Sequence, residues 1–196
     1  VLEHLRVNSP GRFMVNNCLA AVAAARTAGI GIEQIRTGLS CFSPVKGRMA
    51  VYPIGNAITL MDDTYNANPS SVAGALDTLA AVRKDAPGIA VLGDMLELGE
   101  SSDRLHWEIG QKAAMGNVSY LFVYGTKVRF MIEGALEKGL PLDRIFHGEK
   151  KEIAQRVFSL CTSPSFVLVK GSRGMAMETV INKLQQLASA DAEGRS

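Results

Sequence analysis

Residues 60–71, Leu-Met-Asp-Asp-Thr-Tyr-Asn-Ala-Asn-Pro-Ser-Ser, decide the fold. A mainly apolar run over 57–61 ends in two adjacent acids, and a helical pattern follows Asn68. This is the pattern of a buried strand with polar groups at its carboxyl end, where open α/β sheets bind their ligands. An ordinary helix cap at Asn68 and Pro69 is the alternative explanation. Because a cap does not account for the two acids or for Asn66, we interpret the segment as part of a ligand site.

Strand and helix patterns alternate after this segment. Short apolar runs predict strands, and apolar residues at helical spacing predict helices. Strands are expected at 49–54, 57–61, 89–92, 120–124, 144–146 and 166–169, and helices at 70–84, 101–115, 127–138, 149–161 and 174–187. The first two strands are joined at Gly55-Asn56, which is typical of a hairpin turn. We therefore predict an α/β protein with a Rossmann-like, doubly wound, mostly parallel sheet and an initial antiparallel hairpin.

The first 43 residues do not belong to this alternation. Apolar residues at helical spacing predict helices over 15–28 and 32–39, and Pro44 and Gly47 then mark a turn or hinge. This small helical part is expected to be the end of a preceding domain. We predict a helical remnant with its hinge over 1–46, the sheet domain over 47–188, and a disordered tail over 189–196.

The composition is that of a soluble globular protein. Of 196 residues, 47% are hydrophobic and 20% are charged, and the net charge is +2. So small a charge argues against a nucleic-acid surface or a polybasic membrane patch, and no apolar stretch approaches the roughly 20 residues that span a bilayer. The three cysteines have no C-x-x-C spacing, which favours a reducing, cytoplasmic compartment. No signal peptide is expected, and the three histidines are too scattered for a metal site.

Polar or glycine-rich loops follow four of the predicted strands, at 62–63, 93–94, 125–126 and 170–173. Doubly wound topology places these loops on one edge of the sheet. Lys170 and Arg173 lie where free N–H groups at a helix start would favour an anion, although an ordinary glycine turn explains them equally well. The acidic loop at Asp94 fits a cation, an amino group or a plain surface loop. No Walker or G-x-G-x-x-G motif is present. The residues alone therefore indicate ligand-binding edges without a complete catalytic apparatus.

Four strings occur in a recognisable order: Lys-Gly-Arg at 46–48, Asp-Asp-Thr-Tyr-Asn-Ala-Asn-Pro at 62–69, Leu-Gly-Asp-Met-Leu-Glu-Leu-Gly at 92–99 and Val-Lys-Gly-Ser-Arg at 169–173. Together they resemble the Mur ligases of peptidoglycan synthesis, over about residues 8–187. The second and third strings are most similar to the family member that adds D-Ala-D-Ala to UDP-N-acetylmuramoyl-tripeptide. The string Gly-Arg-Phe-Met-Val-Asn-Asn at 11–17 resembles the segment that closes the family's central ATPase domain, with Phe13 in place of a histidine.

The resemblance implies the C-terminal part of a three-domain enzyme. Mur ligases have a domain for the UDP sugar, a central P-loop ATPase and a C-terminal Rossmann-like domain, and this chain matches the end of the second and all of the third. The implied reaction activates the tripeptide carboxylate with ATP as an acyl phosphate, which the amine of D-Ala-D-Ala then attacks.

The resemblance also implies cofactors and partners. The cofactors are ATP and Mg²⁺, and the magnesium ligands are expected mostly outside this chain. We expect a cytoplasmic monomer whose partners are ATP, UDP-N-acetylmuramoyl-tripeptide and D-Ala-D-Ala. Binding to nucleic acid and insertion into a membrane are not expected.

Individual residues acquire roles through the same resemblance. Arg48 is expected to reach the γ-phosphate of ATP when the domains close, Asp63 to accept hydrogen bonds from the ribose, and Asn17 to lie near the adenine. Phe13 would contact the adenine by stacking. The implied nucleotide-binding residues are Asn17, Asp63, Asn66 and Asn68, and the implied substrate-binding residues are Asp94, Lys170, Ser172 and Arg173.

Two other functions stay open at this point. A ligase similar to folylpolyglutamate synthase or to the cyanophycin-type enzymes would share the fold, although the Asn-Ala-Asn-Pro string is not expected there. A nucleotide- or peptide-binding module without catalysis is the alternative from another class. A P-loop upstream of Val1 would favour the ligase, and its absence would favour the module.

Overall fold

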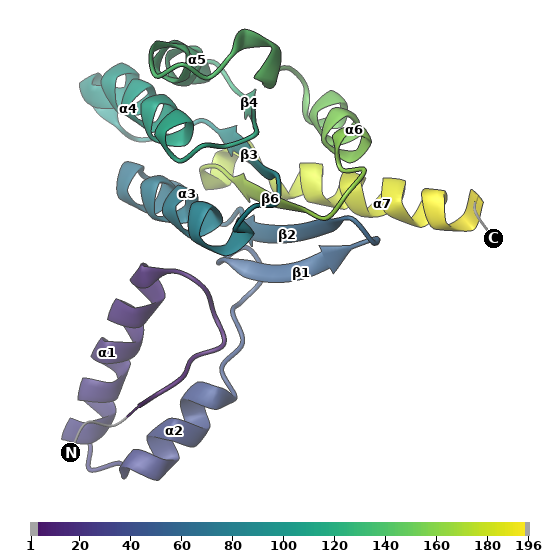
Figure 1. Ribbon diagram of the computed structural model, residues 1–196. Coiled ribbons are helices and arrows are strands. Elements are labelled where there is room, and N and C mark those ends of the chain that lie inside the picture. The colour runs from purple at the N-terminus through teal and green to yellow at the C-terminus, as the bar shows by residue number, and fades with distance from the viewer. Residues whose placement is uncertain (1–3, 195–196) are drawn as a thin grey trace.

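Six strands form the sheet of the main domain. The computed structural model describes residues 4–194, and its strands are β1 (Ala50–Ile54), β2 (Ile58–Asp63), β3 (Gly88–Gly93), β4 (Tyr120–Tyr124), β5 (Ile145–His147) and β6 (Ser165–Lys170). They lie in the order β1-β2-β6-β3-β4-β5 (Figure 1). The β1–β2 pair is antiparallel and the other four strand pairs are parallel. The predicted hairpin followed by a parallel sheet is therefore confirmed.

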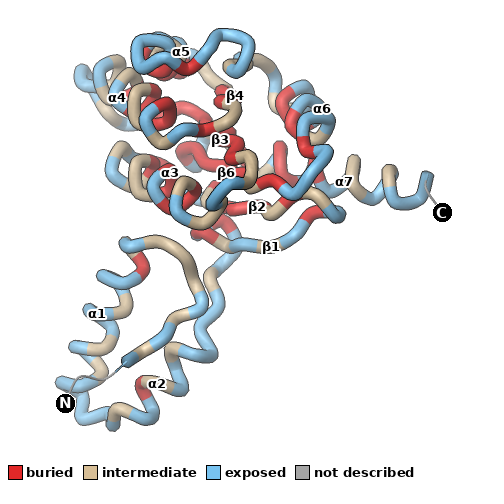
Figure 2. The backbone as a smooth tube through the Cα atoms, in the orientation of Figure 1, coloured by how far each residue is buried: buried red, intermediate tan, exposed pale blue. Residues whose placement is uncertain are grey.

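Helices cover both faces of this sheet. One face carries α3 (Pro69–Arg83), α4 (Ser102–Met115) and α5 (Val128–Glu137), and the other carries α6 (Lys150–Leu160) and α7 (Glu178–Gly194) (Figure 1). Successive residues of a strand point to opposite faces. Met61 therefore packs in the cluster with α3 and α4, whereas Leu60 packs in the cluster with α6 and α7. Figure 2 shows the buried segments concentrated between these layers, so the predicted doubly wound α/β class is confirmed.

The β2–α3 connection forms as its residues predict. Asn68 is the N-cap of α3, because its side-chain oxygen accepts a hydrogen bond from the Ser71 backbone N–H at 2.9 Å. Pro69 occupies the first helical position, where the backbone N–H that proline lacks is not needed. The cap ends the polar segment that follows β2 and keeps it at the carboxyl edge of the sheet.

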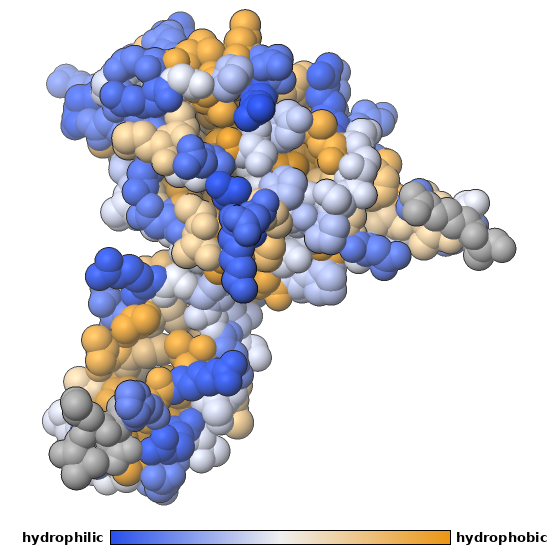
Figure 3. Space-filling view, viewed as in Figure 1, coloured by the Kyte–Doolittle hydropathy of each residue, from blue (hydrophilic) through white to orange (hydrophobic). Residues whose placement is uncertain are grey.

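Two helices precede the sheet domain, and Phe13, at the start of the first, packs against the core of that domain. α1 (Arg12–Thr27) and α2 (Ile32–Ser40) each contain one buried residue, Met14 and Ile35 (Figures 1 and 2). Val15 and Leu19 are 52% and 62% exposed, and Figure 3 shows apolar side chains on the surface of this part. So small a core does not stabilise a domain by itself. The division of the chain at residues 46 and 47 stays a prediction.

The last helix begins later than predicted. The prediction places its start at residue 174, whereas α7 begins at Glu178. The segment Arg173–Met175 forms a 3-10 turn, and Ala176 then adopts a left-handed backbone with φ of 46°. This break separates the loop after β6 from the helix, so the prediction that residues 170–174 open a helix is wrong.

The same helix also ends later than predicted. Residues 189–196 are predicted to be disordered, but α7 continues to Gly194, so that prediction is wrong as far as the structure describes the segment; residues 195 and 196 lie outside the described part. Ala188 packs beside the β1–β2 turn. A Cβ atom added at Gly55, in that turn, would lie 3.4 Å from the Cβ atom of Ala188. Tertiary contact of this kind sustains helices beyond their local propensity. No helix within residues 4–194 is long and apolar enough to cross a membrane.

Candidate functional site

A cleft lies at the carboxyl edge of the sheet. It has a volume of about 270 Å³ and is formed by the start of α1, the segment before β1, the β2–α3 loop and the end of β6. Its lining residues are Phe13, Gly47, Arg48, Asp63, Tyr65, Asn66, Ala67, Asn68, Ser71 and Lys170. The cleft therefore brings together five predicted site residues from segments far apart in the sequence: Arg48, Asp63, Asn66, Asn68 and Lys170.

Asp63 and Lys170 form a largely buried ion pair in this cleft. They are register partners on the adjacent strands β2 and β6, and Lys170 Nζ donates to Asp63 Oδ2 at 2.5 Å. Lys170 Nζ also donates to the Asn66 backbone carbonyl at 2.9 Å. The exposed fractions of the two side chains are 3% for Lys170 and 15% for Asp63. The main partner of Lys170 is thus Asp63, a residue predicted to bind the nucleotide, whereas Lys170 itself is predicted to bind the substrate.

Arg48 supplies the exposed positive charge of the cleft. Its guanidinium lies over the ring of Tyr65, with Cζ 4.0 Å from the ring centroid. A cation stacked on an aromatic face keeps its hydrogen-bond donors at the edges of its plane, where they stay available to an anion. Arg48 is thus oriented by Tyr65 while its donors remain accessible to a ligand.

The two asparagines shape the loop between β2 and α3. Asn66 Oδ1 accepts from the Ala67 backbone N–H at 2.9 Å, and Asn68 caps α3 while also accepting from Ser70 Oγ at 2.9 Å. Both side chains line the cleft. Their described hydrogen bonds are local, so their contribution here is to hold the loop beside Asp63.

Asp94 and Ser172 lie outside the cleft and bind other parts of the protein. The Asp94 carboxylate accepts from the backbone N–H groups of Thr126 at 2.9 Å and Lys127 at 3.0 Å, at the start of α5. Ser172 Oγ accepts from the Leu96 backbone N–H at 2.8 Å. Both residues are buried, with 4% of their surface exposed. They join the loops that follow β3, β4 and β6, and their predicted substrate role stays a prediction.

Arg173 and Asn17 are also outside the cleft. The Arg173 side chain is 67% exposed, and its Nη1 donates to Glu178 Oε1 at 3.0 Å. Asn17 is an exposed residue of α1. Arg173 therefore offers an accessible cation next to the cleft-forming end of β6, whereas Asn17 lies on the helix that contributes Phe13.

The sequence prediction places Asp62 in a ligand site and gives His106 no role, whereas the structure buries both residues at this edge of the sheet. Asp62 is fully buried, and its carboxylate is bonded to the backbone of Gly47 rather than facing the cleft. Successive residues of a strand point to opposite faces, so only one of the two adjacent acids can face the cleft, and the sequence pattern could have indicated this. Burial, together with the nearby Asp62 carboxylate, raises the pKa of the Tyr52 phenol to about 12. His106 is also fully buried, and its Nε2 accepts from the Met95 backbone N–H at 3.0 Å.

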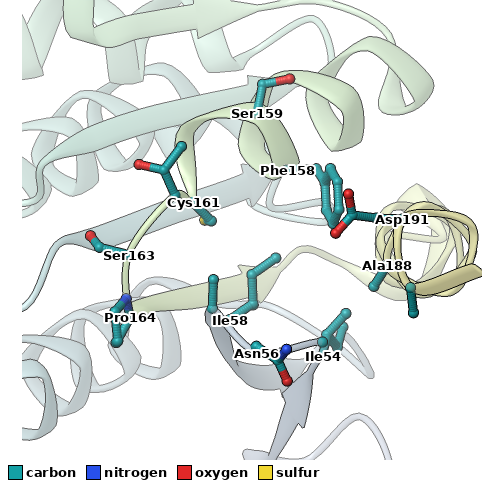
Figure 4. Close-up of a pocket in the computed structure, with 14 residues that line it drawn as sticks. Ile54, Asn56, Ile58, Phe158, Ser159, Cys161, Ser163, Pro164, Ala188 and Asp191 are labelled. Atoms are coloured by element: carbon teal, nitrogen blue, oxygen red, sulfur yellow. The ribbon is translucent and has the colours of Figure 1, made fainter. Parts of the chain in front are cut away.

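A larger cavity lies at the opposite end of the sheet. It has a volume of about 690 Å³ and is formed by the β1–β2 turn, the loop between α6 and β6, and the end of α7 (Figure 4). No lysine, arginine or histidine lines it within the described residues. Cys161, at its wall, is buried, and that burial raises the pKa of its thiol to about 11, which disfavours the reactive thiolate. The charged cleft at the carboxyl edge is therefore the better candidate site.

Comparison with known proteins decides the family. A family model described as Mur ligase, glutamate ligase domain, matches residues 47–173 of this chain. The chain belongs to the Mur ligase family. The resemblance predicted from the four sequence strings is confirmed by this match, which includes β1 to β6 and the whole charged cleft except Phe13.

Two curated relatives of this chain carry the same name. The UDP-N-acetylmuramoyl-tripeptide–D-alanyl-D-alanine ligase of Bacillus subtilis is 33% identical over 175 residues, and that of Haemophilus influenzae is 35% identical over 181 residues. Each match covers 89% of this chain and 38% of the relative. The chain therefore spans well under half the length of the curated relatives that it matches.

Solved structures agree with this relationship. A crystal structure of MurF from Acinetobacter baumannii is 30% identical, with a TM-score of 0.80, and the match covers 93% of this chain and 40% of that one. MurF from Thermotoga maritima, solved in complex with ADP, has the same TM-score of 0.80 at 22% identity, which shows the common fold. The fold of this Mur ligase chain is thus shared with both.

The described part of this chain contains no cluster of metal-ligating side chains. No group of three or more histidine, cysteine, aspartate or glutamate side chains within residues 4–194 is placed to hold a metal ion. The carboxylate of the cleft is instead paired with a lysine, which competes with a cation for the same oxygen.

Proposed function

We propose that this chain is the C-terminal part of an ATP-dependent ligase that joins D-Ala-D-Ala to UDP-N-acetylmuramoyl-tripeptide. The names of the relatives, at 33% and 35% identity across most of the chain, support this reaction. The observation that carries the proposal is the cleft itself. It combines an accessible arginine with a lysine-held carboxylate at the ligand-binding edge of the matched domain.

The proposed reaction needs positive charge beside the transferring phosphoryl group. A carboxylate oxygen of the tripeptide attacks the γ-phosphorus of ATP and ADP leaves, giving an acyl phosphate; the amine of D-Ala-D-Ala then attacks the acyl carbon and phosphate leaves. Negative charge spreads over the phosphoryl oxygens in the first step. Arg48 is the residue we assign to those oxygens, because its planar donors are accessible and fit phosphate geometry.

Asp63 is assigned to the ribose of the same nucleotide. A carboxylate can accept two hydroxyl hydrogen bonds, and one of its oxygens is already fixed by Lys170 at 2.5 Å. The other oxygen is left to accept from a ligand hydroxyl. Asn66 and Asn68 support the loop on which this contact depends. Phe13 and Asn17 would meet the adenine from α1.

The remaining predicted residues are assigned to the peptide side. Arg173 carries an accessible charge that suits a carboxylate of the dipeptide or of the nucleotide-linked peptide. Asp94 and Ser172 would act there by holding the surrounding loops. The division into a central-domain remnant over 1–46 and a ligase domain over 47–188 belongs to this same proposal.

The proposed setting is a cytoplasmic monomer. All three cysteines, Cys18, Cys41 and Cys161, are unpaired, which suits a reducing compartment. The proposed partners are the three substrates, and the net charge of +2 gives no reason to add nucleic acid. A magnesium ion would be held by the other domains of the enzyme.

A substrate-omission assay tests the proposal. The complete protein encoded by the gene that carries this chain should release phosphate only when ATP, UDP-N-acetylmuramoyl-tripeptide and D-Ala-D-Ala are all present. Glutamate with a folate acceptor is the matched control, since a folylpolyglutamate-synthase-like enzyme would respond to that pair. Release that depends on glutamate, or none with any acceptor, would contradict the proposed function.

A further inference from the structure

Asp62 is a carboxylate that the proposed chemistry does not use, although it lies next to Asp63. We propose that Asp62 is a positioning residue: its buried carboxylate fixes the turn at residues 45–48 and so presents Arg48 to the cleft. This inference rests on the proposed function only for the role of Arg48 in catalysis. The structural part, that Asp62 holds the turn, stands on its own.

The Asp62 carboxylate is fully buried and accepts several hydrogen bonds. Oδ2 accepts from the Gly47 backbone N–H at 3.2 Å and from the Tyr52 hydroxyl at 3.5 Å, while Oδ1 accepts from Thr64 Oγ1 at 2.7 Å and from the Thr64 backbone N–H at 3.3 Å. A buried charge without such partners is strongly unfavourable. These donors therefore fix the carboxylate, and the carboxylate in turn fixes Gly47.

The turn that Asp62 holds has an unusual backbone. Gly47 has φ of 79°, and Met49, which is fully buried, has φ of 56°. A left-handed backbone is unfavourable for methionine and persists only where its surroundings determine it. Arg48 lies between these two residues, and its own N–H donates to the Val45 carbonyl at 2.9 Å. The turn thus sets the direction in which the Arg48 side chain leaves the backbone.

The loop after β2 makes a second hydrogen bond to the turn. The Tyr65 backbone N–H donates to the Gly47 carbonyl at 2.9 Å, and the Tyr65 ring carries the Arg48 guanidinium at 4.0 Å. Gly47 is therefore bonded through both its N–H and its carbonyl to the segment that starts at Asp62. Because Asp63 lies on this segment as well, the fixed turn sets the spacing between Arg48 and Asp63. A small displacement of a reacting group lowers a rate steeply.

Nuclear magnetic resonance of the 196-residue chain tests the structural part. In Asp62→Asn the amide can offer one acceptor only, and its NH₂ group would face a donor. We expect the Gly47 and Tyr65 amides to exchange at least about 10-fold faster and the contacts between the Arg48 side chain and the Tyr65 ring to disappear, with β3 unchanged. Persistence of both the slow amides and the ring contacts would overturn the proposal.

Two further variants keep this test decisive. Asp77→Asn makes the same chemical change on α3, at a side chain that is 64% exposed and paired with Lys112, and should leave the turn unchanged. Should Asp62→Asn fail to fold, Thr64→Val removes the 2.7 Å donor to Asp62 while keeping the side-chain shape. The same faster exchange at Gly47 is then expected, and wild-type exchange would overturn the proposal.

A double-mutant cycle in the complete ligase tests the link to Arg48. Asp62→Asn should lower kcat by roughly 10- to 100-fold with the KM for ATP little changed, and it should add nothing further once Arg48 is replaced by alanine. Effects of the two changes that simply multiply would show that Asp62 acts by another route. If Arg48→Ala alone leaves kcat unchanged, the assigned role of Arg48 fails, and the resonance measurements still decide whether Asp62 holds the turn.

Discussion

At the scale of single residues, the cleft depends on a lysine that is almost removed from water. Lys170 is 2% exposed, and such a cation is stable only when paired and hydrogen-bonded. Asp63 and the Asn66 carbonyl supply that pairing. The arrangement fixes the Asp63 carboxylate in one orientation, so a ligand bound there would not have to order this side chain.

Replacing Asp63 with asparagine tests this arrangement. In the complete ligase, Asp63→Asn should raise the KM for ATP and leave kcat within a few-fold, because ribose contacts are made before and during phosphoryl transfer alike. It should also lower the free energy of unfolding by about 3 kcal/mol, because Lys170 keeps its burial and loses its carboxylate. Steady-state kinetics and urea unfolding measure the two effects. A collapse of kcat at saturating ATP would rule out the ribose assignment.

Tyr52 makes a prediction about alkaline pH. Its pKa is raised from 10.0 to about 12 by burial and by the Asp62 carboxylate, so the folded state favours the neutral phenol. The unfolded chain loses this proton near pH 10 and the folded chain only near pH 12, so the stability from this group is present below pH 10 and is lost between pH 10 and 12. Urea unfolding across this range should show a shallower decline in Tyr52→Phe. Identical declines would contradict the assignment.

At the scale of elements, the strand ends explain what the sequence predicts and what it does not. The β1–β2 hairpin and the Asn68 cap depend on neighbours in the sequence. The hairpin forms as predicted, and the cap, which is the alternative explanation of its segment, forms as well. The pairing of Asp63 with Lys170 depends on β2 lying beside β6, which a local pattern does not specify. The engagement of Asp94 by the start of α5 likewise requires β3 and β4 to be neighbours. Local patterns therefore place most of the predicted site residues at the carboxyl edge of the sheet, but they do not separate the residues that line the cleft from those that support its loops.

The segment between α2 and β1 carries a prediction about motion. A hinge is predicted from Pro44 and Gly47, but Gly47 is bonded to the segment after β2, so bending is expected before Val45. Since α1 buries only Met14, its amides should exchange faster than those of the fully buried strand β3. Hydrogen exchange with mass spectrometry measures both segments. Equal protection of α1 and β3 would show that the helical part does not move independently.

At the scale of the whole molecule, binding and chemistry are expected to be divided between domains. The sheet domain offers an arginine and a held carboxylate, while no P-loop motif occurs in the 196 residues. Phosphoryl transfer needs the groups that cradle the phosphates as well as the cation beside them. On the proposed function, the cleft of about 270 Å³ would form one wall of a nucleotide site that another domain completes.

The isolated chain should therefore be inactive. Incubated with ATP, UDP-N-acetylmuramoyl-tripeptide and D-Ala-D-Ala, the 196-residue chain should release no phosphate above a heat-denatured control. A phosphate-release assay makes this measurement, and the complete protein serves as the positive control. Phosphate release from the isolated chain that requires both peptide substrates would contradict the proposal that catalysis needs the other domains.

The central claim is that Arg48 completes a ligase site from this cleft, and the turnover of Arg48→Ala in the complete protein tests it most directly. The charge that Arg48 neutralises grows mainly in the transition state, so kcat should fall by roughly 100-fold or more, about 3 kcal/mol, with a much smaller change in the KM for D-Ala-D-Ala. The Arg48→Lys variant keeps the charge and loses the planar arrangement of donors, so its kcat should lie between those of the wild type and of Arg48→Ala. An unchanged kcat in Arg48→Ala would contradict the account.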